Sequence, residues 1–143
     1  MIYDATLEPL IDEQRLAMAA LGTGMPGSSP ATGLLPAEDQ TLPGNSQLSL
    51  RIIRPERAPV GVMLHIHGGG FAHGAPQMAD AMNSFLACTI GVATVSVDYR
   101  LAPAHAHPAA LHDCEAAALW LLRAAREQFG TADYFVAAVR IPE

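Results

Sequence analysis

The amino-acid sequence predicts an α/β fold in which helices cover the faces of a mostly parallel sheet. Two observations indicate it. Apolar runs at residues 60–66 and 92–97 have the character of strands that are buried on both faces. A helical segment near residues 78–89 lies between them, and strand, helix, strand is the order of a right-handed parallel crossover. A long helix after the second strand favours this fold class over a helical bundle.

The amino-terminal segment predicts one helix and one loop. Residues 7–21 place apolar side chains at helical spacing, with acidic residues early in the run, and Gly22-Thr23-Gly24 marks the end of that helix. Residues 25–38 are rich in Pro, Gly, Ser and Ala and have neither helical nor strand periodicity, so they predict a loop or connector. We therefore divide the chain into a helix-and-loop segment, residues 1–41, and a core, residues 42–143.

The core predicts alternating strands and helices. Apolar and polar residues alternate over residues 48–53 until Pro55, as in a half-buried strand. The strand at residues 60–66 stops at three glycines, and Gly91 separates the next helix from the strand at residues 92–97. The last helix begins near Pro108, a residue that fits a first helical turn, and ends at Gly130. Residues 135–139 have the character of a short strand.

Composition and charge exclude several classes of function. All eight basic residues are arginine and the net charge is -6, so no basic patch is available for nucleic acid. The first eight residues lack a secretion signal, and the longest charge-free run, residues 81–97, is interrupted by polar residues and predicts no membrane span. Cys88 and Cys114 lie in apolar helical contexts and form no disulfide framework, which favours a cytoplasmic location.

Three consecutive glycines directly follow a buried strand, in the segment His65-Ile66-His67-Gly68-Gly69-Gly70-Phe71. Glycine adopts backbone conformations closed to other residues, so such a loop is able to point N–H groups outward. In acyl transfer, donors fixed beside the developing oxyanion are worth about 2.7–4 kcal/mol each. A simple turn and a phosphate-binding loop are the alternatives. The chain lacks the Lys of a Walker loop and the spacing of a dinucleotide loop, so the phosphate interpretations are excluded.

A second motif precedes the last helix and reads Val95-Ser96-Val97-Asp98-Tyr99-Arg100-Leu101-Ala102-Pro103. Together with the His-Gly-Gly-Gly loop, it closely resembles the hormone-sensitive-lipase branch of the α/β-hydrolases, the fold-3 carboxylesterases, over residues 42–130. The resemblance implies an α/β-hydrolase fold, small acyl esters as substrates and no cofactor. Residues 7–21 are similar to the helix that contributes to the cap over the acyl pocket in that family.

The resemblance also assigns roles to residues of the glycine loop. Gly69 and Gly70 are the expected oxyanion-hole donors, through their backbone N–H groups. Gly68, which enables the turn, and Phe71 are expected to line the binding site. His67 is expected to brace the loop and not to act as the catalytic base.

The second motif is expected to be structural. Asp98, Tyr99 and Arg100 would satisfy buried polar groups at the strand end, because a charged group there must be paired. The motif departs from the family pattern at two positions: Ala104 stands where Glu is usual, and His107 stands where an aromatic residue is frequent. A local interaction is expected to be lost.

The nucleophile elbow, G-x-S-x-G, occurs nowhere in the sequence, although the family pattern places it just beyond Gly130. We therefore expect an incomplete α/β-hydrolase fold, truncated or frameshifted near that residue. Such a chain would be inactive alone, because loss of a triad nucleophile costs about 10⁶ in kcat. Without the elbow strand, the strand at residues 60–66 is expected to become a sheet edge that self-associates or pairs with a complementing carboxyl-terminal chain.

Three further interpretations remain open at this point. The chain would be a binding or regulatory module that holds an acyl ligand without turnover, or one half of a split esterase whose triad comes from another polypeptide. A metal site is the third, since the chain has six histidines, and His65 and His67 share a strand face. No cysteine lies near these two residues and His67 already has a loop role, so no metal is expected.

Overall fold

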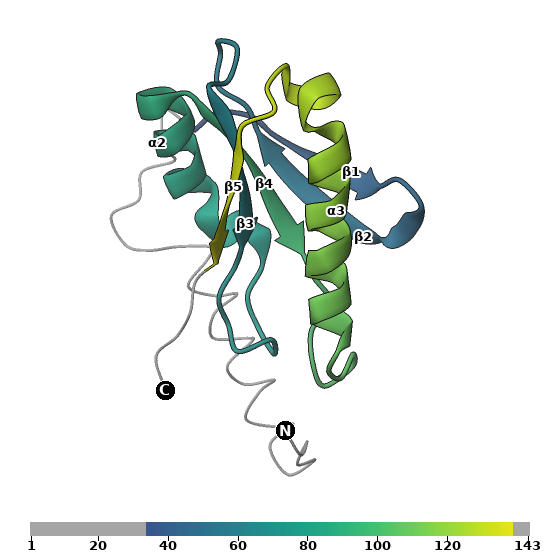
Figure 1. Cartoon of the computed structure of the whole chain (residues 1–143). Coiled ribbons are helices and arrows are strands. Elements are labelled where there is room, and N and C mark those ends of the chain that lie inside the picture. The colour runs from purple at the N-terminus through teal and green to yellow at the C-terminus, as the bar shows by residue number, and fades with distance from the viewer. Residues whose placement is uncertain (1–33, 139–143) are drawn as a thin grey trace, which may run out of the picture.

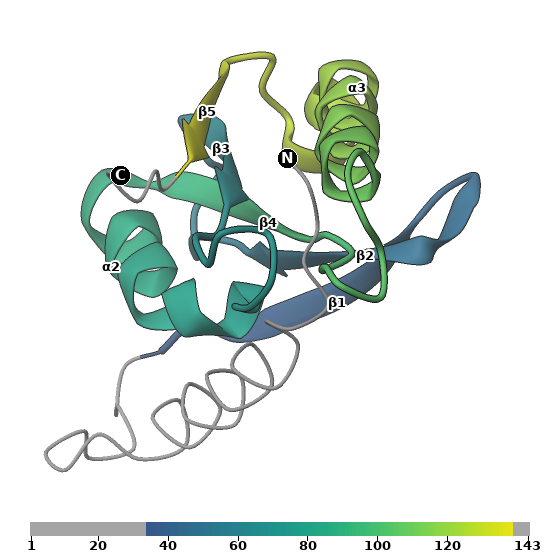
Figure 2. The same cartoon turned by 90° about the horizontal axis from the view of Figure 1, so that it is seen from below.

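The computed structural model describes residues 34–138, and the helix expected over residues 7–21 lies outside them. The described residues form one mixed sheet with a helix on each face (Figure 1). Helix α2 (Asp80–Ile90) covers one face and helix α3 (Ala109–Phe129) the other, as the view from below shows (Figure 2). The predicted α/β fold is therefore confirmed.

The sheet has five strands in the order β1-β2-β4-β3-β5. Their bounds are Ala37–Leu42 for β1, Asn45–Ile53 for β2, Gly61–Ile66 for β3, Val92–Asp98 for β4 and Tyr134–Ala138 for β5. Strands β1, β2 and β4 pair antiparallel, whereas β3 pairs parallel with both β4 and β5. A short 3-10 helix, η2 (Pro76–Ala79), precedes α2. The right-handed crossover predicted from strand, helix, strand corresponds to β3, α2 and β4.

The two faces of the sheet differ in polarity. Val62, Leu64, Val95 and Val97 point to the side of α3 and belong to the main apolar core. Their neighbours in β3 and β4 point to the side of α2, where His65, Thr94 and Ser96 are buried with Asn83 of the helix. Asn83 Nδ2 donates to Ser96 Oγ over 3.0 Å, and His65 Nδ1 lies 3.2 Å from the same oxygen. These contacts attach α2 to the two parallel strands through polar groups.

Strand β1 is the element that sequence patterning missed. Residues 25–38 were expected to be a loop, but the strand begins at Ala37, and the boundary expected between residues 41 and 42 falls inside it. Its side chains are mostly polar and exposed because it pairs only with β2 at the edge of the sheet. Asp39 also receives Arg51 Nη1 of β2 over 2.9 Å. A strand held by backbone pairing and an ion pair does not need alternating apolar side chains, so the sequence pattern did not reveal it.

The expectation that β3 becomes a sheet edge is wrong. Strand β5 pairs with it in parallel, from Val62 opposite Tyr134 to Ile66 opposite Ala138. Residues 135–139, whose pattern indicates a short strand, overlap β5, which fills the position beside β3 and is the edge strand on that side of the sheet. Within the described residues, no helix is long and apolar enough to cross a membrane.

A buried ion pair connects the end of β4 to α3. Asp113 is 1% exposed and accepts from the backbone N–H of Arg100 over 2.9 Å, and from its guanidinium over 2.8 and 2.9 Å. Burial raises the pKa of Asp113, but the hydrogen bonds and the charge of Arg100 lower it more, so the pKa lies below its ordinary value. The carboxylate is therefore charged at neutral pH and holds the strand end against the helix.

Asp113→Asn is expected to destabilise the protein, because an amide cannot accept all three of these hydrogen bonds as a charged group. The loss should be about 1.5–3 kcal/mol, the range for hydrogen bonds to charged groups, measured by urea unfolding at pH 7. Glu115→Gln is the control, since Glu115 is exposed on the same helix. Equal stability of the two variants would contradict the assignment.

The same pair predicts a dependence on pH. A carboxyl whose folded pKa is depressed stabilises the protein above its unfolded pKa of about 3.9, and this contribution is lost as the pH falls through the lower, folded value. The difference in unfolding free energy between the wild type and Asp113→Asn should therefore be constant near neutral pH and shrink below about pH 4.

Candidate active site

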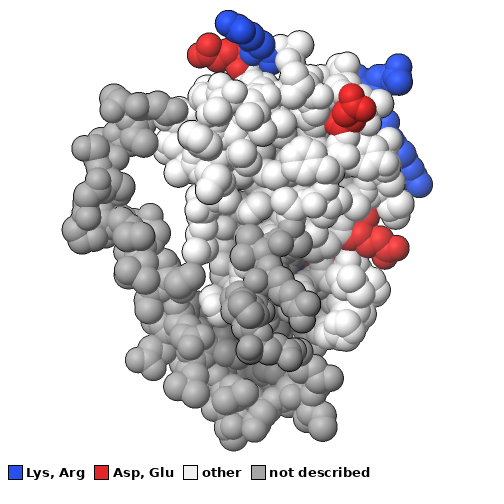
Figure 3. All heavy atoms as spheres, turned by 60° about the vertical axis from the view of Figure 1, so that its left-hand side comes forward, with Lys and Arg blue, Asp and Glu red and all other residues white. Residues whose placement is uncertain are grey.

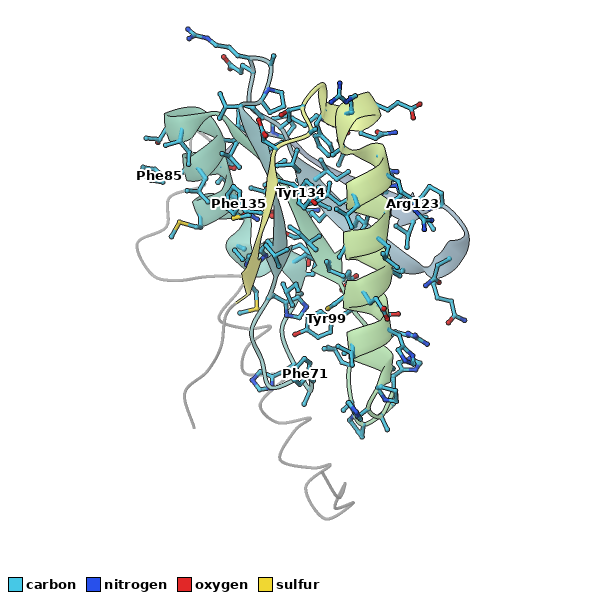
Figure 4. All side chains as sticks on the ribbon, in the orientation of Figure 1. Phe71, Phe85, Tyr99, Arg123, Tyr134 and Phe135 are labelled. Atoms are coloured by element: carbon cyan, nitrogen blue, oxygen red, sulfur yellow. The ribbon has the colours of Figure 1, made fainter. Side chains whose placement is uncertain are left out.

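Two loops meet at the carboxyl ends of β3 and β4. The glycine loop, defined as residues 67–71, follows β3, and the segment that begins at Tyr99 follows β4. Because the two strands are parallel, adjacent and in register, both loops leave the sheet at the carboxyl ends of its parallel strands. In α/β sheets, ligands bind outside these strand ends. Figure 4 shows Phe71 and Tyr99 together at that end of the molecule.

The backbone of the glycine loop needs glycine at one position above all. Gly69 has a φ of 128°, and a Cβ placed there would overlap the carbonyl group of His73. Its own carbonyl oxygen accepts from the N–H groups of Ala72 and His73, each over 3.1 Å. Phe71 has a φ of 62°, which is unusual for a bulky residue and is found mainly where the surrounding structure enforces it. The loop is thus a tight, fixed turn.

This turn leaves two backbone donors unused. Among residues 34–138, no group accepts a hydrogen bond from the N–H of Gly69 or of Gly70. Gly69 is buried and Gly70 is exposed, so the pair lies at the boundary between the loop and solvent. An unpaired N–H in a buried backbone is unfavourable, and a ligand oxygen would relieve it. Two such donors, adjacent in sequence, are what an oxyanion hole requires.

His67 is buried and contacts its own loop. Its Nδ1 lies 2.9 Å from the carbonyl oxygen of Gly68, so the proton of the neutral ring is placed on Nδ1. Burial lowers the pKa of His67, and the nearby His73 lowers it further, against the opposing effects of the Gly68 carbonyl and Asp98. The imidazole is therefore neutral at pH 7, with its Nδ1 proton engaged by the loop.

Tyr99 connects the two loops directly. It is 2% exposed, and its hydroxyl donates to the backbone carbonyl of His67 over 2.7 Å. Its ring stacks on the His67 imidazole, with centroids 4.1 Å apart and planes 12° apart. Burial raises the pKa of Tyr99 to about 12, so the hydroxyl keeps its proton and remains a donor. Sequence patterning placed Tyr99 at a strand end but did not reveal this contact.

The charged residues on either side of Tyr99 behave differently from each other. Arg100 is paired with Asp113 as expected, although the sequence alone did not single out that partner. Asp98 is exposed, and none of the described residues donates a hydrogen bond or forms an ion pair with its carboxylate. The expected structural role of Asp98, the last residue of β4, therefore stays a prediction.

Phe71 presents an aromatic surface beside the unused donors. Its side chain is 56% exposed, and its ring lies 6.1 Å from that of Tyr99 in a tilted arrangement. Its carbonyl oxygen accepts from the N–H of Ala102 over 2.8 Å, which fixes the end of the glycine loop. An apolar ligand group would be able to pack on this ring while an oxygen of the ligand meets the donors.

Histidines do not converge on a metal position in this part of the chain. His65 points toward α2 and contacts Ser96, whereas His67 lies beyond the strand and stacks on Tyr99. Within residues 34–138, no three His, Cys, Asp or Glu side chains form a group that would hold a metal ion. The arrangement at the glycine loop offers hydrogen-bond donors and apolar surface.

Comparisons with known proteins agree with this geometry. A family model described as "alpha/beta hydrolase fold" matches residues 63–137. The arylesterase of Saccharolobus solfataricus is 37% identical over 75 residues, which are 52% of this chain and 24% of that protein. The carboxylic ester hydrolase LipN of Mycobacterium tuberculosis is 31% identical over 118 residues, which are 81% of this chain and 31% of that protein.

Solved structures extend the likeness to nearly all of the chain. A bacterial heroin esterase superposes with a TM-score of 0.78 at 30% identity, over 90% of this chain and 42% of that one. The chain thus spans less than a third of the length of the two curated relatives and less than half of this structure. On the matched fold and motifs, it belongs to the α/β-hydrolase fold family, among the fold-3, hormone-sensitive-lipase-like carboxylesterases.

Proposed function

We propose that this chain supplies the oxyanion hole of a serine hydrolase that acts on carboxylic esters. The observation that supports it is the pair of N–H groups on Gly69 and Gly70, which have no acceptor among residues 34–138 and lie at the carboxyl end of a central parallel strand. The related proteins named as an arylesterase and a carboxylic ester hydrolase favour an acyl ester as the substrate.

In the reaction, a serine hydroxyl attacks the ester carbonyl carbon, its proton passes to a base supplied with the serine, and the C=O electron pair moves to the oxygen. When the C=O bond re-forms, the bond to the alcohol breaks and the alcohol leaves with that proton. The N–H groups of Gly69 and Gly70 would donate to this oxyanion, where each donor is worth about 2.7–4 kcal/mol. Gly68 and Phe71 would line the site, the latter packing on an apolar group of the ester. His67 would hold the loop in shape, through the contact of its Nδ1 with the Gly68 carbonyl and through its ring stacked on Tyr99.

The attacking serine and its acid–base partners would come from polypeptide other than these 143 residues, which contain no G-x-S-x-G motif. Without a nucleophile, two donors leave only a small fraction of the catalytic effect, since loss of the serine alone costs about 10⁶ in kcat. We therefore propose that the chain is inactive alone and becomes active when the elbow and the rest of the triad join it, in the same protein or from a second chain.

An ester hydrolysis assay tests this proposal. The chain alone is expected to turn over p-nitrophenyl acetate no faster than buffer and to escape covalent labelling by a fluorophosphonate. A version restored with the elbow and the segment after it should hydrolyse the ester. In that version Gly69→Ala should lower kcat by about 10²–10³, because the added Cβ would overlap the His73 carbonyl and displace the donor, with an effect like that of losing one oxyanion donor.

Gly44→Ala is the matched control for this substitution. Gly44 also has a positive φ, 85°, but lies in the turn between β1 and β2, where an added Cβ meets no atom within 4 Å. Its substitution should leave kcat unchanged. Robust turnover by the chain alone, with labelling of this polypeptide, would overturn the proposal. Tight binding of acyl analogues without turnover by the restored version would favour a binding module instead.

The exposed edge of the sheet supports the proposed need for a partner. Strand β5 carries three exposed apolar side chains, of which Val136 is 57% exposed, and α2 adds Met82 and Phe85, each 61% exposed. We call Met82, Phe85 and residues 134–136 the β5 face. Figure 4 shows Phe85 and Phe135 on the same side of the sheet, and the surface there is almost free of charge (Figure 3). The one charged residue of α2, Asp80, is paired with Arg51 over 2.8 Å.

We propose that the missing part of the hydrolase sheet joins at the β5 face and that isolated chains associate through it. An unpaired, uncharged edge strand is a template for pairing with another chain. In light scattering after size exclusion, the wild type should therefore show a mass that rises with concentration. Val136→Lys should shift the distribution toward the monomer, because an edge lysine opposes pairing.

Leu122→Lys is the control for this charge, since Leu122 is an exposed apolar residue on α3 and is not part of the β5 face. Its mass distribution should match that of the wild type. A wild-type chain that is monodisperse, monomeric and cooperatively unfolding at all concentrations would contradict the proposed association.

A further inference from the structure

The strip that follows β4, residues 99–102, contacts both ends of the glycine loop. At the start of the loop, the Tyr99 hydroxyl donates to the His67 carbonyl over 2.7 Å. At its end, the N–H of Ala102 donates to the Phe71 carbonyl over 2.8 Å. Between these two bonds lie the three glycines that carry the candidate donors. The glycine loop is therefore held at two points by one short segment, residues 99–102, which follows β4.

The strip is itself attached to the body of the protein. Arg100, in its middle, uses its backbone N–H and its guanidinium to bind the carboxylate of Asp113, which is buried in α3. A continuous path of hydrogen bonds thus runs from α3 through the strip to the glycine loop. Each step in it joins groups that are distant in sequence.

Contacts from outside the glycine loop are needed because glycine has no strong preference for one backbone conformation. Gly69 and Gly70, with φ of 128° and 59°, lie in regions that glycine enters freely and leaves as freely. Fixing the backbone of one residue in a single conformation costs conformational entropy. Donors that must lie still before the oxyanion forms therefore need anchors outside the glycines.

We propose that residues 99–102 are a clamp that sets the direction of the Gly69 and Gly70 N–H groups, with Tyr99 as its principal positioning residue. The value of the clamp for catalysis rests on the proposed function, whereas the clamp itself is a property of the fold. Tyr99 acts in two ways, through the hydroxyl on the His67 carbonyl and through the ring stacked 4.1 Å from the imidazole.

Removing the hydroxyl alone separates positioning from packing. Tyr99→Phe keeps the stacked ring and deletes one donor, whereas Tyr134→Phe deletes the hydroxyl of an exposed tyrosine on β5 and serves as the matched control. Backbone ¹⁵N relaxation of the full chain reports the order of each glycine. In the wild type and the control, Gly69 and Gly70 should have order parameters near about 0.85, and in Tyr99→Phe they should fall toward about 0.6.

Amide exchange gives the second readout. The N–H groups of His73 and Ala102, which bond to the loop, should exchange about two- to tenfold faster in Tyr99→Phe, as expected for loss of one hydrogen bond. Amides of β4, such as that of Val95, should keep their rates. A uniform increase across loop and strand would show a merely structural role and overturn the clamp, as would unchanged loop dynamics.

Two further measurements keep the test decisive if Tyr99→Phe fails to fold. Arg100→Lys retains the tyrosine but loses the paired hydrogen bonds to Asp113, and it should also lower the order of Gly69 and Gly70. Mobile glycines in the wild type would refute the clamp without any variant. Because neither measurement uses a substrate, a failed clamp and a failed esterase proposal give different results.

Discussion

The parallel pairing of β3 with β4 is the constraint on which the site depends. The register runs from Gly61 opposite Val92 to Ile66 opposite Val97, so the strands end together. The residues that follow them, His67 and Tyr99, consequently meet face to face although they are 32 positions apart in sequence. Apolar side chains on the α3 side of both strands maintain this register, because a shift by one residue would turn Val95 and Val97 toward the polar side of α2.

Polar groups at the strand ends then determine the shape of the loop. Asp113 is charged because Arg100 pairs with it, and His67 is neutral because it is buried. Burial opposes a positive charge on His67 more strongly than the Gly68 carbonyl and Asp98 favour it, and the neutral ring packs flat on Tyr99. Asp113 is thus charged and His67 neutral, and each state favours the contacts that hold residues 67 and 99–100 in place.

The sequence predicted the parts of this structure that local patterns encode. Apolar runs located β3 and β4, Gly91 and Gly130 ended the helices as expected, and the glycine triplet indicated a loop able to expose N–H groups. Patterns do not encode pairing across the sheet. Strand β1 escaped notice because its stability comes from β2 and from Asp39 bound to Arg51, and the contact from Tyr99 to His67 exists only once two strands are parallel.

The glycine loop depends on only a small part of the fold. Its glycines, their two anchors and the ion pair behind them all come from β3, β4 and α3, which share one apolar core. All of these contacts are made by residues of this chain, so the proposed donors would hold their direction before a serine is present. Preorganisation of this kind is the condition under which backbone dipoles stabilise a transition state without reorganising during the reaction. The β5 edge differs from the glycine loop in this respect: the loop makes its contacts within the chain, whereas the apolar side chains of residues 134–136 are exposed.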